Sequence, residues 1–147
     1  MENKAAGNAY FSTGDYESAA EQYTVALSKC LAADKVLAST ILSNRSLCHL
    51  KLDHHSEAEA DATAALREDS NNIKALRHRG AARLHMEGQG DLAIADFELF
   101  VERGGTMDKK LLKRLTKRQV SADVLNRLAG RRSDDKGDSS GGEKKSP

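Results

Sequence analysis

Two pairs of polar side chains are spaced so that each pair shares one face of a helix. Lys4 and Asn8 are four residues apart, and so are Lys74 and His78. Four residues is close to one helical turn, which places both members of a pair on the same side. Ammonium and amide groups donate hydrogen bonds, and anionic oxygens accept them strongly. This spacing indicates a carboxylate-binding site, provided that the fold brings the pairs together.

The other reactive side chains form no catalytic set. The sequence has five histidines and two cysteines but no glycine-rich phosphate loop, HExxH motif or paired CxxC motif. His54 and His55 are expected in a turn, where a metal would also need a carboxylate or cysteine at helical spacing, and none is found. His49 is expected to pack. We therefore expect no enzyme activity, no cofactor and no bound metal.

A repeat supplies the elements that must position the paired donors. Ala19, Ala58 and Ala93 each follow a turn and open a similar run of small and bulky apolar residues. Recurrence within about 20–50 residues is typical of stacked helical units. An upstream helix is predicted in each unit, over residues 3–12, 39–52 and 73–86. The sequence therefore predicts an all-α solenoid of helix pairs.

Composition supports this fold class. Of the 147 residues, aromatics make up 4%, and the only proline is Pro147, so the core must be built from Ala and Leu, which suits closely packed helices. Small residues are expected where the two helices of a pair cross. These are Gly7 with Ala19, Ser46 with Ala58, and Gly80 with Ala93.

Charge and hydropathy exclude several classes of protein. The formal net charge is +1, which argues against a dedicated nucleic-acid binder. No apolar run approaches the roughly 20 residues that cross a bilayer. Cys30 and Cys48 follow no secretory signal, so reduced thiols and a cytoplasmic location are expected.

The first unit carries a family pattern. Residues 4–11 (KAAGNAYF) and 14–19 (GDYESA) resemble the tetratricopeptide repeat (TPR) family, and the later units match more loosely, without the proline that usually ends each repeat. The resemblance covers residues 2–104 and implies three repeats, at about 2–31, 37–70 and 72–104.

Two further helices and a tail are expected after the repeats. Gly104-Gly105 ends a helix, and Ser121 can cap a short one. Because the open end of a solenoid exposes an apolar face, we interpret residues 106–130 as capping helices. Residues 131–147 lack the apolar side chains needed to offset ordering entropy, so a disordered tail is predicted.

The resemblance assigns a role to the paired donors. In stacked helix pairs the first helices line a concave groove. TPR co-chaperones use such a groove as a two-carboxylate clamp for the C-terminal Glu-Glu-Val-Asp of cytosolic heat-shock chaperones of the 70 and 90 kDa classes. The positions matching the clamp are Lys4, Asn8, Asn44, Lys74 and His78, and the further peptide contacts implied are Phe11, Leu47, Leu50 and Lys51.

His78 departs from the family pattern, which often has arginine there. An imidazole with an unperturbed pKa of about 6.5 is mostly neutral at pH 7 and offers no bidentate fork. We expect one arm of the clamp to be weakened. If His78 touches the ligand, affinity is expected to rise as pH falls from about 8 to 6.

Three other interpretations stay open beside a co-chaperone adaptor. The paired donors could form a solvated helix face, or the groove could belong to a TPR scaffold subunit that binds a dedicated protein partner without chaperone specificity. The basic stretch 109–118 could attract RNA, an acidic partner or anionic lipid. This stretch lacks interleaved aromatic residues for base stacking, which favours the solvated outer face of a capping helix.

Overall fold

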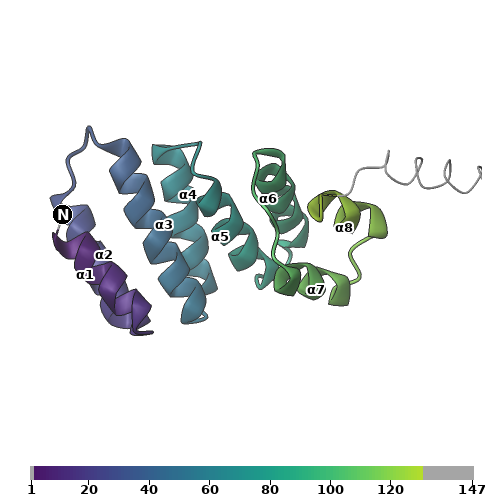
Figure 1. The fold of residues 1–147 in the computed structure, drawn as a ribbon, viewed down its shortest axis with the longest axis horizontal. Coiled ribbons are helices and arrows are strands. Elements are labelled where there is room, and N and C mark those ends of the chain that lie inside the picture. The colour runs from purple at the N-terminus through teal and green to yellow at the C-terminus, as the bar shows by residue number, and fades with distance from the viewer. Residues whose placement is uncertain (1, 131–147) are drawn as a thin grey trace, which may run out of the picture. The chain divides into compact units, whose positions relative to one another are not determined.

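The computed structural model describes residues 2–130, so the predicted tail at 131–147 lies outside the described residues. This range is helical and contains no strand, which confirms the predicted all-α class (Figure 1). The chain divides into two compact units at residues 97 and 98, and each is described by itself. The helices are α1 (Glu2–Ser12), α2 (Tyr16–Lys29), α3 (Lys35–Lys51), α4 (His55–Glu68), α5 (Ile73–Leu84), α6 (Gly90–Glu102), α7 (Lys109–Lys117) and α8 (Ala122–Leu128).

Side-chain caps set where several helices of the first unit begin. Asp15, Asp34 and Asn72 each accept a hydrogen bond from the backbone N–H three residues further on, which satisfies a donor that the helix cannot use internally. The cap at Asp34 starts α3 at Lys35, one turn before the predicted residue 39. The first helix of the second repeat is therefore longer than its sequence pattern suggested.

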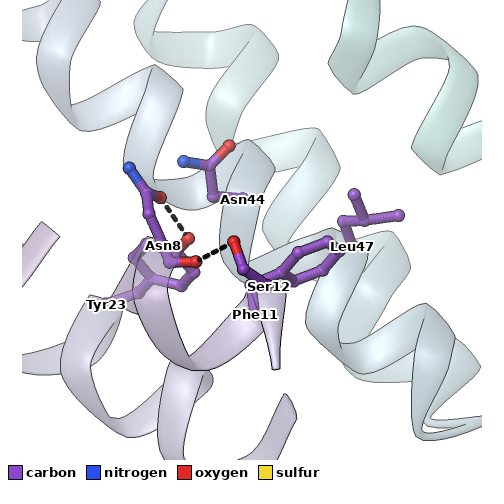
Figure 2. Close-up of a pocket in the computed structure, with 6 residues that line it drawn as sticks. All are labelled: Asn8, Phe11, Ser12, Tyr23, Asn44 and Leu47. Atoms are coloured by element: carbon purple, nitrogen blue, oxygen red, sulfur yellow. Dashed lines mark hydrogen bonds between the residues drawn. The ribbon is translucent and has the colours of Figure 1, made fainter. Parts of the chain in front are cut away.

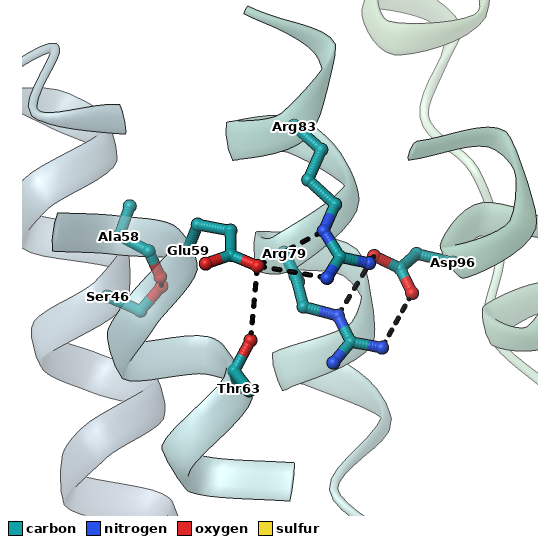
Figure 3. Close-up of polar contacts among 7 residues, drawn as sticks. All are labelled: Ser46, Ala58, Glu59, Thr63, Arg79, Arg83 and Asp96. Carbon is teal, nitrogen blue, oxygen red and sulfur yellow. Dashed lines mark hydrogen bonds and ion pairs between the residues drawn. The ribbon is translucent and has the colours of Figure 1, made fainter. Parts of the chain in front are cut away.

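Helices α1 and α2 pack as a pair, as do α3 and α4, and small residues lie at the crossings as predicted. A Cβ atom on Gly7 would come within 2.6 Å of the Tyr23 ring, and one on Gly80 within 2.6 Å of the Phe97 ring. An aromatic ring thus packs against each glycine. This ring belongs to the residue one helical turn after the alanine that was expected at the crossing. In the second repeat Ser46 Oγ donates to the Ala58 carbonyl oxygen at 2.7 Å (Figure 3).

Half-buried ion pairs also connect α4, α5 and α6. Arg79 binds Asp96 through two hydrogen bonds, and Arg83 bridges Asp96 and Glu59 (Figure 3). Hydrogen bonds to charged groups contribute roughly 1.5–3 kcal/mol each when the partner is kept from water. The network therefore joins α4, α5 and the first turns of α6.

The second unit contains the two helices expected after the repeats. Asp108 caps α7 by accepting from the Leu111 N–H at 2.7 Å, and Ser121 caps α8. Helices α7 and α8 contact each other. That they cover the end of the repeats stays a prediction. The cationic residues of the basic stretch are exposed, namely Lys109, Lys110, Lys113, Arg114, Lys117 and Arg118.

Within residues 2–130, no helix combines the length and the apolar character needed to span a bilayer.

The crossing of α5 and α6 predicts the effect of adding one methyl group. Gly80→Ala gains helix propensity of about 1 kcal/mol, but its Cβ overlaps the buried Phe97 ring, and overpacking costs about 1–3 kcal/mol. We expect a net destabilisation on the order of 1 kcal/mol, seen as a melting temperature lower by about 4–8 °C in circular dichroism. Gly90→Ala is the control, because nothing lies within 4 Å of its Cβ position. An equal loss in both variants would contradict the close crossing.

Candidate functional site

A pocket of about 230 Å³ lies between α1, α2 and α3 (Figure 2). The amides of Asn8 on α1 and Asn44 on α3 both border it, which brings together two of the predicted carboxylate-binding residues. Carboxamide N–H groups at the mouth of an apolar pocket can hold an anionic oxygen while a short apolar side chain fills the space below. The pocket is lined by Asn8, Phe11, Ser12, Tyr23, Asn44 and Leu47.

Tyr23 fixes the orientation of these amides from beneath. Its ring is 2% exposed, and its hydroxyl donates a hydrogen bond to Asn8 Oδ1. Burial raises the pKa of Tyr23 to about 12, while a hydrogen bond with the Asn44 side chain partly opposes the shift. The phenol therefore stays protonated at neutral pH. Because it occupies Asn8 Oδ1, the Nδ2 donors of Asn8 are left to face a ligand.

A second pocket, of about 320 Å³, continues the first along α3 and α5. Asn44 borders both pockets, and Lys74 borders the second, together with Ser43 and Asn72. Asn8, Asn44 and Lys74 thus follow one surface across three helices. The structure places Asn44 in one pocket with Asn8 and in another with Lys74, and that these donors act together on one ligand stays a prediction.

Only some of the other predicted peptide contacts line a pocket. Phe11 and Leu47 form the apolar part of the first pocket. Lys4 lies one turn before Asn8 on α1 and is half-buried, Leu50 is half-buried, and Lys51 is exposed. None of these three residues lines either of the two pockets. Their contact with a ligand stays a prediction.

His78 is buried beneath this surface. The residue is 5% exposed, and its Nδ1 lies 3.1 Å from the Ser43 carbonyl oxygen. Because a carbonyl only accepts, Nδ1 carries the proton of the neutral ring. Burial, with a smaller contribution from the cations Arg77 and Lys74, lowers the pKa of His78 to about 4. The sequence-based expectation that His78 gains charge between pH 8 and 6 is therefore wrong.

The signal for Tyr23 was missed in the sequence, since a tyrosine on an apolar helix face is usually a packing residue. The hydroxyl becomes informative only once Gly7 allows the ring to lie against α1. His78 was misjudged for a related reason: spacing along α5 does not tell which side of the helix meets α3.

Together, these observations define a helix-pair repeat domain with a polar groove that could hold a carboxylate. No protein-family model matches the chain. Over 126 residues it is 36% identical to the protein unc-45 homolog B of Danio rerio, covering 85% of this chain and 13% of that protein. It thus spans a small fraction of the length of that relative.

Solved structures with the same fold extend the comparison. The second TPR domain of human RPAP3, in complex with the HSP70 peptide SGPTIEEVD, is 33% identical, with a TM-score of 0.66 over 81% of this chain and 93% of that one. The second TPR of Spaghetti (RPAP3), bound to the HSP90 peptide SRMEEVD, is 36% identical, with a TM-score of 0.61 over 69% and 88%. The chain belongs to the tetratricopeptide repeat family.

Burial of His78 predicts how stability depends on pH. The unfolded chain binds a proton at this residue below about pH 6.5, whereas the folded chain does so only near pH 4. Stability is therefore lost as pH falls through this window. From pH 7 to pH 5 we expect His78 to lower the free energy of unfolding by about 2 kcal/mol, measured in urea. The loss should be smaller in His78→Asn, and equal losses in both proteins would contradict the buried neutral ring.

Proposed function

We propose that this chain is a co-chaperone adaptor whose groove binds the acidic C-terminal tails of heat-shock chaperones of the 70 and 90 kDa classes. The observation that carries the proposal is the alignment of Asn8, Asn44 and Lys74 along two pockets that share Asn44. The solved relatives with Glu-Glu-Val-Asp peptides support it, because their ligands end in two carboxylates.

The chemistry of the groove fits such a tail. A terminal residue with an α-carboxylate and a side-chain carboxylate presents four anionic oxygens, which need several donors at once. The amides of Asn8 and Asn44 supply neutral donors, and the ammonium of Lys74 supplies charge. The apolar pocket walls formed by Phe11 and Leu47 suit the valine that precedes the terminal residue.

We propose that the domain acts by binding alone. The groove is lined by amides, hydroxyls, Lys74, Asp69 and apolar side chains, and we propose no reaction for it. Cys30 and Cys48 are free thiols, which suits a reducing compartment, so we place the protein in the cytoplasm.

The test is a calorimetric titration with two forms of one peptide, SRMEEVD with a free C-terminus and with a C-terminal amide. Hydrogen bonds to charged groups contribute roughly 1.5–3 kcal/mol, so amidation should weaken binding by at least about tenfold. Asn44→Ala should lower the affinity for the free acid by a similar factor. Lys110→Ala, which removes an exposed lysine of α7, is the control and should bind normally.

Each alternative gives a different result in this titration. A scaffold groove that takes an internal helix of a dedicated partner would bind neither peptide, or both equally. Equal affinity for the acid and the amide would therefore refute the carboxylate clamp.

Tyr23→Phe tests whether the buried hydroxyl orients the amides. The variant keeps the ring against Gly7 but loses the bond to Asn8 Oδ1. A lost hydrogen bond corresponds to about 1 kcal/mol, so affinity for the free-acid peptide should fall about fivefold. The ratio of the affinities for the free-acid and the amidated peptide should also become smaller. A drop in thermal stability with an unchanged ratio would mean that the hydroxyl serves folding alone.

A further inference from the structure

The turn between α3 and α4 holds two imidazoles close together through its backbone geometry. The His54 N–H donates to the His49 carbonyl oxygen at 2.8 Å, and the Asp53 N–H donates to that of Leu50. Asp53 has a positive φ of 59°. This is a Schellman motif, in which a contact between the residues corresponding to His49 and His54 is usually apolar. Here the two imidazole rings lie 5.8 Å apart, centroid to centroid.

The start of α4 adds a carboxylate to the same place. His54 is the N-cap residue of α4, and Glu57 stands three residues later, where a capping-box side chain turns back toward the cap. Glu57 Oε2 lies 4.0 Å from His54 Nδ1. One ligand atom each from His49, His54 and Glu57 falls within 4.8 Å of the others. The sequence-based expectation that no carboxylate stands near His54 is therefore wrong.

One ring nitrogen of His49 has no hydrogen-bond partner. Its Nδ1 is buried and forms no hydrogen bond. On the other side of the ring, Nε2 lies 3.6 Å from Asp61 Oδ2, and Arg45 holds Asp61 at 2.7 Å. A carboxylate facing Nε2 favours the tautomer protonated there, which leaves the lone pair on Nδ1. Burial lowers the pKa of His49, so the ring is neutral at pH 7.

The equivalent turn of the first repeat has more favourable residues than the turn of the second repeat. There Gly14 takes the positive φ, and Asp15 caps α2 by accepting from the Ser18 N–H. In the second repeat, Asp53 replaces the glycine, and His54 makes no side-chain cap bond. Both changes are unfavourable locally. Departures from local preference are expected where a site imposes its own demand.

We propose that His49, His54 and Glu57 form a binding site for a divalent transition-metal ion of the zinc type. A set of two imidazoles and one carboxylate binds zinc in preference to magnesium or calcium. Bond lengths of about 2.0–2.1 Å place tetrahedral ligands about 3.3 Å apart, a distance that the exposed side chains of His54 and Glu57 can reach by changing rotamer. Water completes the coordination, and the ion ties the end of α3 to the start of α4.

The experiment is a calorimetric titration of the full chain with zinc chloride near pH 7 in a buffer that does not bind metals. We expect one zinc ion per chain, together with a change in the ¹⁵N shift of the His49 imidazole. His54→Ser removes a ligand and supplies a better N-cap, so it stays folded and should weaken zinc binding at least about tenfold. Glu57→Gln should weaken zinc binding by a similar factor.

The matched control is His55→Gln. His55 is the neighbour of His54, but its ring stacks on that of His85 at 4.5 Å and is not part of the three-donor cluster. This variant should bind zinc with unchanged affinity. Zinc binding that survives both His54→Ser and Glu57→Gln, or that is lost in His55→Gln alone, would overturn the site. Peptide titrations are a separate measurement, so the metal site and the groove can fail independently.

Discussion

The contact between Gly7 and the ring of Tyr23 is the constraint on which the candidate groove depends. Because Gly7 has no Cβ, the ring lies flush against α1, and only from there does its hydroxyl reach Asn8. Any larger residue at position 7 would move the phenol and release both amides at once. In the first repeat, the packing of two helices therefore also sets the orientation of Asn8, one of the proposed ligand donors.

The third repeat uses the same close crossing for another purpose. Phe97 occupies the place of Tyr23 against Gly80 but has no hydroxyl to orient a neighbour. His78 stands two residues before that glycine, as Asn44 stands two residues before Ser46. Instead of facing a ligand, the ring of His78 binds the Ser43 carbonyl and joins α5 to α3. Lys74 supplies the positive charge in this part of the groove, and Asp69 lines the same pocket.

The sequence predicted the elements better than the chemistry of single side chains. Apolar periodicity, the small residues at the crossings and cap residues such as Ser121 depend on near neighbours, so the helices and their pairing were largely predictable. The meeting of Asn8 with Asn44 also followed from the repeat. The burial of His78 and the role of Tyr23 depend on contacts between helices, which spacing along one helix does not encode.

The α3–α4 turn also shows that spacing along the sequence does not reveal which side chains meet, even for residues close in the chain. His49, His54 and Glu57 are close in sequence, yet no single helix places them together, because a helix ends and another begins between them. Their meeting depends on the left-handed conformation at Asp53, which a non-glycine residue adopts at a cost. The first repeat has the favourable pair Gly14-Asp15 at this turn, and the second repeat does not. We infer that a local constraint acts on the turn of the second repeat. The proposed metal site supplies such a constraint at His54, which stands where Asp15 caps α2 in the first repeat.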